Sequence, residues 1–228
     1  MLPNDPACAH IDHHTPAYCE AMVVGSEARP GSGAPPTPPE FTEAVRAMEQ
    51  ARLRPEVLSE PMPAPQRIAP YAAALSADVT VDGHDLSTGR IILLHDPAGN
   101  DSWDGTFRCV AYARAEIELE MITDPALADV GWSWLTEALA AHGAEYGAAS
   151  GTVTRVATDS FGAMSDDSGS AQIEIRASWT PQLVDGRLDI TGHVEAWGEL
   201  LCTAAGLPPV PEGVTAMPSR RGRRGAGH

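Results

Sequence analysis

The stretch Arg90–Met121, RIILLHDPAGNDSWDGTFRCVAYARAEIELEM, decides the fold. It predicts two long strands joined by a loop that is rich in turn residues and acids. The apolar run Ile91–Leu94 stops at Asp96-Pro97, and apolar and polar residues then alternate over residues 107–121. Alternate side chains of a strand point to opposite faces, so a period of two predicts a half-buried antiparallel sheet with one charged, wet face.

Helices are predicted on either side of this stretch. Thr37-Pro38-Pro39-Glu40 has the pattern of a capping box and starts a helix that ends before Pro55. Asp124-Pro125 starts a second helix, which Gly143 ends, and a third helix ends at Gly206. The apolar face of the second helix is expected to comprise Leu127, Val130, Gly131, Trp134, Leu135 and Ala138.

Further strands are predicted at residues 73–81, 145–157 and 171–180, where apolar and polar residues alternate or β-forming residues dominate. Between residues 55 and 70 five prolines exclude a helix and favour an extended segment draped over the domain. The Trp residues at 132, 134, 179 and 197 are expected to form one aromatic core cluster.

The predicted order is helix, three strands, helix, two strands, helix (α-β-β-β-α-β-β-α). It predicts an α+β fold with a predominantly antiparallel, five-stranded sheet and helices on one face. The order resembles that of secretion-chaperone-like small α+β domains, and fold alone does not imply function. We expect a single domain over residues 37–211, between a disordered leader at 1–36 and a disordered, Arg-rich tail at 212–228.

Charge limits the classes of partner. The formal net charge is −16, all 15 cations are arginine, and four of them lie in the last nine residues: Arg220, Arg221, Arg223 and Arg224. An acidic body repels phosphate backbones, so nucleic acid is expected to bind, if at all, only through these four arginines. No segment reaches the roughly 18 to 20 apolar residues that cross a bilayer, so no membrane partner is expected.

Cysteine usage favours a reducing compartment. Cys8, Cys19, Cys109 and Cys202 are widely and irregularly spaced, which is unlike a disulfide framework. No basic region followed by an apolar one marks a signal peptide at the N-terminus. The sequence therefore predicts a soluble cytoplasmic protein, and no cofactor is expected.

Two groups of residues have side chains that can bind a metal. His95, Asp96, Asp101 and Asp104 in the central loop would serve a metal-assisted hydrolase, although their spacing matches no known calcium or zinc motif and such residues also build turns. The second group lies in the leader, and it has neither a Cys-x-x-Cys nor a His-x-x-x-His unit. Its members are Cys8, His10, His13, His14 and Cys19. No metal site is predicted from either group.

The charged sheet face is the main candidate for binding. If the strands that carry them are neighbours, its charged residues form a docking platform; otherwise they form only weak ion pairs on a wet surface. Trp103 at the loop tip either folds back onto the sheet or meets a partner. The predicted binding residues are Trp103, Arg108, Arg114, Glu116, Glu174 and Arg176.

Several long peptides resemble an uncharacterised actinobacterial family, domain of unknown function 3000. The resemblance covers roughly residues 40–211, and the lysine-free, alanine-rich composition fits such a host. The family implies no activity, cofactor or catalytic residue. The peptides that carry the resemblance are residues 53–75, 89–118 (GRIILLHDPAGNDSWDGTFRCVAYARAEIE), 130–139, 149–162, 172–181 and 196–209.

The leading hypothesis is a non-enzymatic, adaptor- or chaperone-like domain that binds a protein or peptide through the charged sheet face and the loop at residues 95–105. The alternatives are the metal-assisted hydrolase and a nucleic-acid accessory protein that acts through the Arg tail. The expected partner is an unknown protein, and a second copy of the chain in a homodimer is the alternative.

Overall fold

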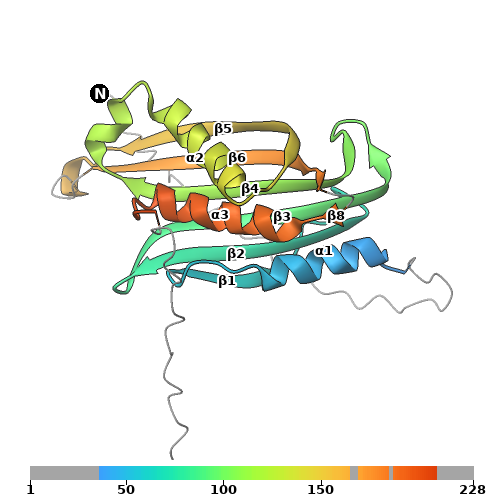
Figure 1. Ribbon diagram of the computed structural model, residues 1–228. Helices are drawn as coiled ribbons and strands as arrows, with labels where there is room; N and C mark the ends of the chain where they lie inside the picture. Colours follow the sequence, from blue (N-terminus) through green and yellow to red (C-terminus); the bar gives the residue numbers. More distant parts are fainter. Residues whose placement is uncertain (1–35, 165–168, 185–186, 210–228) are drawn as a thin grey trace, which may run out of the picture. The chain divides into compact units, whose positions relative to one another are not determined.

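The computed structural model describes residues 36–164, 169–184 and 187–209. The predicted leader with its Cys/His group and the predicted Arg-rich tail lie outside the described residues. The described part forms one layer of helices on one antiparallel sheet (Figure 1). The predicted α+β class is confirmed.

Within the described residues the main sheet has six strands, in the spatial order β1-β2-β3-β4-β6-β5, and all neighbours are antiparallel. The sequence predicted five strands and missed the first, because the prolines of residues 55–70 hide it. A proline is tolerated in β1 because this strand lies at an edge of the sheet. The strands are β1 (Val57–Met62), β2 (Tyr71–Val81), β3 (His84–Asn100), β4 (Gly105–Ile117), β5 (Tyr146–Thr158) and β6 (Ser170–Pro181), and a separate short ladder joins β7 (Leu183–Val184) to β8 (Arg187–Leu188).

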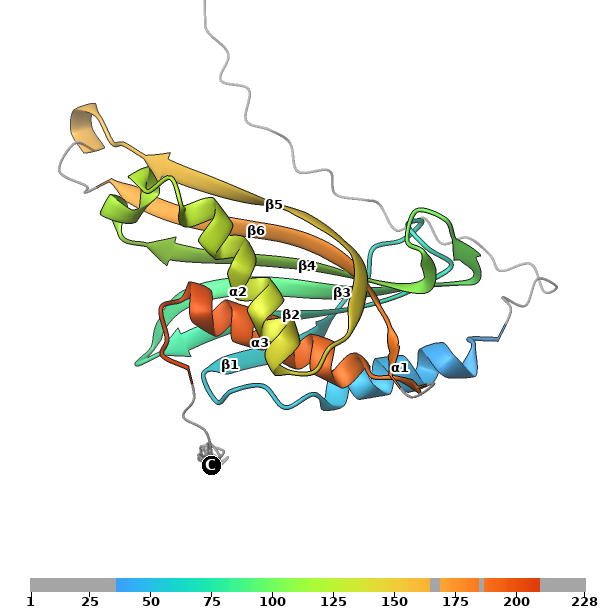
Figure 2. The ribbon, with the colours of Figure 1, turned by 45° about the horizontal axis from the view of Figure 1, so that its top comes forward.

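Helices cover one face of the sheet and leave the other open (Figure 2). Their buried stripes pack on the odd-numbered residues of β3, β4 and β6, which is the face that the period of two predicted to be apolar. The helices are α1 (Pro39–Gln50), α2 (Leu127–Ala141) and α3 (Ile190–Ala204), with short 3-10 turns η1 (Leu119–Thr123) and η2 (Gly162–Met164).

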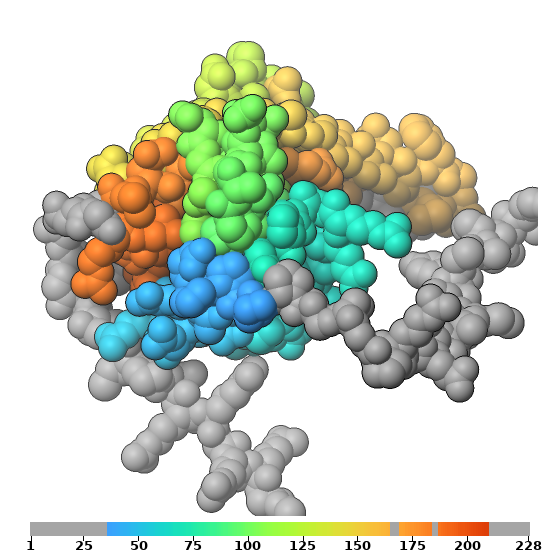
Figure 3. Space-filling model, turned by 90° about the vertical axis from the view of Figure 1, so that its right-hand side faces the viewer, coloured from blue at the N-terminus to red at the C-terminus, as the bar shows by residue number. Residues whose placement is uncertain are grey.

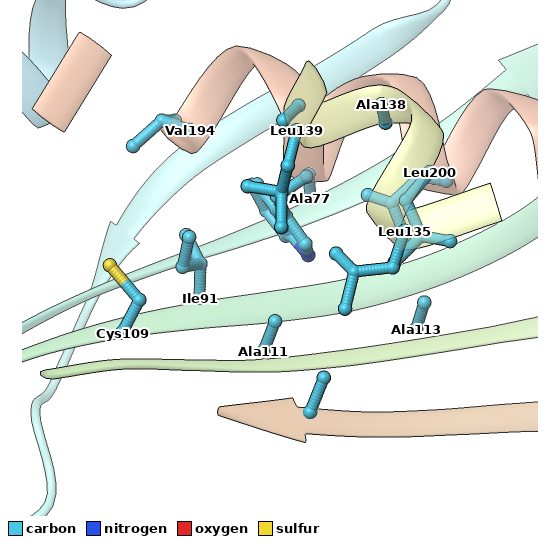
Figure 4. Close-up of a cluster of buried hydrophobic side chains, with 14 of the residues drawn as sticks. Ala77, Ile91, Cys109, Ala111, Ala113, Leu135, Ala138, Leu139, Val194 and Leu200 are labelled. Atoms are coloured by element: carbon cyan, nitrogen blue, oxygen red, sulfur yellow. The ribbon is translucent and has the colours of Figure 1, made fainter. Parts of the chain in front are cut away.

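The core lies between these helices and the sheet. Figure 4 shows α2 and α3 side chains such as Leu135 and Leu200 above Ile91 and Ala111 of the strands. Small residues on the strands let α3 approach closely. A Cβ on Gly89 would lie 2.6 Å from both Leu201 Cδ2 and the carbonyl oxygen of Tyr112, so this position of β3 accepts only glycine without a shift.

Two of the four predicted core tryptophans are fully buried. Trp179 and Trp197 have no exposed surface, whereas Trp132 and Trp134 are half-buried against the edge of the core. The Trp179 indole donates a hydrogen bond to His193 Nδ1 (3.0 Å), so its one polar atom is satisfied inside the core.

The alternation over residues 107–121 overstates the length of β4. The strand ends at Ile117, and Leu119 and Met121, which were predicted to point inward, are 46% and 37% exposed in η1. Pairing with β6 ends at Ile117↔Ala171, and pairing with β3 ends earlier. The chain therefore leaves the sheet where it loses strand partners, although its sequence continues to alternate.

Two predicted details of the helices are wrong. Pro38, not Thr37, is the N-cap of α1, and no side chain caps it; Thr42 Oγ1 instead donates to the Pro38 carbonyl (3.2 Å). In α2 the predicted core residue Val130 is 42% exposed, while Leu139 is fully buried. The predicted cap Asp124 does act at this end, since its carboxylate accepts from the Ala126 amide (2.8 Å).

Candidate functional site

The open face of the sheet carries the predicted charged residues together. Strands β4 and β6 are neighbours, with Arg114 paired to Glu174 and Glu116 paired to Gln172. All these side chains, with Arg176, occupy even-numbered positions and so share the face opposite the helices. The docking platform was predicted only if these two strands are neighbours, and they are.

A groove crosses this open face. The segment from Met62 to Pro70, which links β1 to β2, folds over the sheet and forms the apolar wall of a cavity of about 560 Å³. The sequence predicted an extended segment draped over the domain at this place. We call this cavity the open-face groove; it is lined by Met62, Pro63, Pro65, Ile68, Ala74, Arg90, Ile92, Val110, Ala111, Tyr112, Ser150, Gly151, Thr152, Arg176, Ala177 and Ser178.

The floor of the groove is one row of residues across five strands. The register pairs Ala74 with Ile92, Ile92 with Val110, Val110 with Ser178, and Ser178 with Ser150. Neighbouring strands lie about 4.8 Å apart, so the row is about 19 Å long. It changes along its length from apolar side chains next to residues 62–68 to hydroxyl groups at β5.

A second row of residues forms a cationic wall beside the floor. Arg90, Tyr112 and Arg176 are paired in register on β3, β4 and β6. The two guanidinium carbons lie 5.2 and 5.1 Å from the centre of the Tyr112 ring, so the ring is held between two cations. This arrangement fixes the long arginine side chains at the groove without burying them.

Glu174 ties the wall together. Its carboxylate pairs with Arg176 Nη1 (2.6 Å) and accepts a hydrogen bond from the Tyr112 hydroxyl (3.2 Å). Burial and this hydrogen bond raise the pKa of Tyr112 above its ordinary value. The phenol is therefore a stable neutral donor, and within the described residues Arg90 has no carboxylate of its own.

Arg108 differs from the prediction that it lies on the wet face. It is on the open side of β4 but only 7% exposed, because β5 bulges over it between Gly147 and Ser150. Ala148 in this bulge has φ +48°, in the left-handed region, and its carbonyl accepts from Arg108 Nη1 (2.8 Å). Burial lowers the pKa of the guanidinium, which nevertheless stays charged.

The remaining hydrogen bonds of Arg108 go to neutral oxygens. Nη1 donates to Thr180 Oγ1 (3.0 Å), and Nη2 donates to Ser178 Oγ (2.7 Å), Ser178 O (3.3 Å) and Ser150 Oγ (3.3 Å). No carboxylate of the described residues forms an ion pair with it. A buried charge without an opposite charge is unusual, and this one donates to both serine hydroxyls at the end of the groove.

The loop at residues 95–105 does not gather its acids. His95 is buried on the helix-covered side, and Asp96, the next residue, uses its carboxylate to accept from the Ala98 amide (3.1 Å). Asp101 and Asp104 are exposed in the turn, where Asp104 has φ +54°. No three His, Cys, Asp or Glu side chains of the described part of the chain are placed to hold a metal ion.

His95 is part of an aromatic cluster under α1. Its ring stacks on Phe107 (4.1 Å between centroids) and lies 5.8 Å from Phe41; Nδ1 lies 3.0 Å from the Thr106 carbonyl, and Nε2 lies 3.5 Å from Glu40. Figure 3 shows the end of the β3–β4 hairpin standing above α1. This end of the hairpin anchors a helix, which accounts for the burial of His95.

Trp103 folds back onto the sheet in part. Its side chain is half-buried, and its carbonyl accepts a hydrogen bond from the Thr180 hydroxyl on β6. Trp103 is not among the residues that line the open-face groove.

The two described cysteines lie in the core. Cys109 and Cys202 are buried and free, and burial raises the pKa of each thiol to about 12. The thiolate is the reactive form of cysteine, and burial disfavours this form at both positions.

Sequence reasoning missed three parts of the groove. Arg90 and Tyr112 were assigned to no site, and residues 62–68 were not connected to the charged face. Positions 90 and 112 are even-numbered, like the residues of the charged face, so the sequence could have placed both residues on that face. The register between β3 and β4 that brings the two together depends on the hairpin, whose pairing skips from His95 to Asn100.

The comparisons with known proteins place the chain in a family without assigning it a role. No helix of the described residues is long and apolar enough to cross a membrane. No curated protein and no solved structure matches the chain. The model of one family, whose description is "Protein of unknown function (DUF3000)", matches residues 37–215, and the chain belongs to this family.

Proposed function

We propose that the protein is a non-enzymatic binding domain that holds an extended segment of a partner protein in the open-face groove. The observation that carries the proposal is the groove itself, an apolar floor between a wall of prolines and a wall of arginines. Ligand sites are typically concave and mostly apolar, with a few placed polar groups, and the volume of about 560 Å³ lies in their usual range.

The length of the floor supports a peptide ligand. At about 3.3 Å per extended residue, a row of about 19 Å accommodates about six residues. Such a peptide would cross β2 to β5 and place apolar side chains on Ile92 and Val110. The arginine wall selects for acidic partners, which a protein of net charge −16 would otherwise repel.

The two rival functions have less support. A metal-assisted hydrolase needs His95, Asp96, Asp101 and Asp104 around one point, but no three His, Cys, Asp or Glu side chains of the described residues are placed to hold a metal ion. The nucleic-acid hypothesis rests on Arg220, Arg221, Arg223 and Arg224, which lie outside the described residues; it predicts salt-sensitive binding that is lost when residues 219–228 are deleted. A cytoplasmic location, in an actinobacterial host, belongs to the same proposal and is supported by the free thiols of Cys109 and Cys202.

A selection from random peptides tests the proposal. One pool displays the peptides with free C-termini and a second pool displays them inside a longer chain. The bait is the full chain, either unchanged or as Val110→Trp, which fills the groove floor. Val130→Trp, the same change on an exposed position of α2, is the matched control.

We expect peptides that bind the unchanged chain and Val130→Trp alike and lose at least tenfold in affinity for Val110→Trp. Circular dichroism checks that both variants are folded. If neither pool yields binders, or if the binders ignore Val110→Trp, the open-face groove is not a peptide site.

A further inference from the structure

The hydroxyl end of the open-face groove has the features of an anion site. Ser150 and Ser178 end the floor row, and their oxygen atoms lie 3.3 Å apart. Both oxygens accept hydrogen bonds from Nη2 of Arg108, which lies on the same face of the sheet. Each serine oxygen thus accepts one hydrogen bond from the guanidinium, and the hydrogen of each hydroxyl remains to be donated to another acceptor.

One of these two hydrogens has no acceptor. The serines can share one hydrogen bond, and the described residues provide no other acceptor for the second hydroxyl. Thr180 differs, because it accepts from Arg108 and donates to the Trp103 carbonyl, so its hydroxyl is fully used. The groove end therefore presents a donor that is polarised by a buried cation.

The charge of Arg108 lacks an opposite charge among the described residues. Arg108 donates only to neutral oxygens, and the Glu174 carboxylate of the same face is already paired with Arg176. An anion at Ser150 and Ser178 would lie one hydroxyl away from Arg108. It would supply the negative charge that Arg108 lacks among the described residues, next to a side chain that is itself buried.

We propose that the hydroxyl end of the groove binds a carboxylate, and that the ligand is the free C-terminus of a peptide with apolar residues before it. This rests on the proposed peptide function. A chain end bears its carboxylate on the axis of the segment, so a peptide along the floor row reaches both serines without turning. A side-chain carboxylate projects away from the axis of an extended segment and meets the walls instead.

The two display pools test this inference separately from the proposed function. We expect groove-dependent binders mainly in the pool with free C-termini, with apolar residues at the last positions. Groove-dependent binders that come equally from both pools would overturn the C-terminal assignment and leave peptide binding itself intact. An absence of groove-dependent binders from both pools would instead overturn the proposed function.

One selected peptide, made as the free acid and as the C-terminal amide, gives the sharper readout. Calorimetry should show at least a tenfold preference for the acid with the unchanged chain, since a hydrogen bond to a charged group is lost with the amide. Ser178→Ala should reduce that preference several-fold while the affinity for the amide stays the same. Ser76→Ala, on the same face outside the groove, should change neither value.

Arg108→Met should abolish the preference. If this variant does not fold, the double variant Ser150→Ala with Ser178→Ala replaces it, because Ser150 is exposed and Ser178 is only partly buried. Equal affinities for acid and amide with the unchanged chain, or a preference that survives the loss of both serine hydroxyls, would overturn the carboxylate site.

Discussion

The two faces of the sheet consist of the same strands and follow different rules. On the helix-covered face the odd-numbered residues are alanine, isoleucine, cysteine, phenylalanine and tryptophan over residues 107–117 of β4 and 171–179 of β6, and nearly all are buried. On the open face the even-numbered residues are mainly charged, hydroxylic or amide, and their burial ranges from exposed Arg114 to buried Arg108. On the helix-covered face the polarity of a residue is therefore enough to predict its burial. On the open face the burial of a residue depends on what the neighbouring strands do around it.

Arg108 and Arg114 show this difference at two positions of one strand. Both point to the open face of β4, yet Arg114 is exposed and hydrogen-bonds Gln172 (3.0 Å), while Arg108 is enclosed by the bulge of β5. Arg114 thus forms a hydrogen-bonded pair at the surface, whereas Arg108, the same residue type on the same strand, belongs to a buried network. The bulge, and not the residue type, makes the difference.

The largest effect should come from the helix-covered face. Trp179→Ala removes a side chain with no exposed surface and should lower the free energy of unfolding by about 3–5 kcal/mol. Tyr112→Ala on the open face removes a half-buried ring and should cost clearly less. Urea denaturation of both variants gives the comparison; equal losses would mean that the open face is as tightly packed as the core.

The next effect separates the two arginines. Arg108→Met leaves the partly buried carbonyl oxygens of Ala148 and Ser178 with fewer donors and removes the donors to three hydroxyl groups, so it should cost about 2–3 kcal/mol. Arg114→Met should stay within about 0.5 kcal/mol, because an exposed polar contact contributes little. The same denaturation assay measures both, and a small loss for Arg108→Met would show that the bulge adjusts around the shorter side chain.

Much of the fold could be predicted from local sequence pattern. The alternation of β4 and β6 identifies their buried faces, and Asp124 and Gly143 mark the ends of α2. The alternation at Leu119 and Met121 misleads because a strand also needs partners, which a period cannot report. Strand β1 was missed for the converse reason, since its pairing with β2 overrides a sequence that does not alternate.

The site was less predictable because it depends on register. The charged residues of β4 and β6 were expected on one face, but the wall of Arg90, Tyr112 and Arg176 requires three strands in a fixed alignment. The burial of Arg108 requires the positive φ of Ala148, which cannot be predicted from an alanine at this position. Long-range pairing and local backbone strain therefore account for most of what sequence reasoning could not supply.

A pH effect should come from the core histidine. Burial lowers the pKa of His193 to about 4, with Asp189 opposing the shift, while its ordinary value is 6.5. The unfolded chain therefore binds a proton that the folded chain rejects between these values, and stability falls as the pH falls from about 6.5 towards 4. The loss from this residue between pH 7 and pH 5 should be about 2 kcal/mol.

His193→Gln isolates this contribution, because an amide oxygen can still accept from the Trp179 indole. The variant should lose about 2 kcal/mol less than the unchanged chain between pH 7 and pH 5 in urea denaturation. Parallel pH profiles for the two proteins would mean that His193 accepts its proton without unfolding the core.

The smallest effect should come from removing the Tyr112 hydroxyl in the wall of the groove. Tyr112→Phe keeps the ring between Arg90 and Arg176 and removes only the hydroxyl that donates a hydrogen bond to Glu174, so it should cost about 0.5–1 kcal/mol. Tyr112→Leu also removes the ring and with it both cation contacts, which adds about 0.5–1 kcal/mol for each exposed contact. If the two variants are equally stable by urea denaturation, the contacts of the two arginines with the ring contribute no stability. The arginines would then stand beside each other only because the strand register places them there.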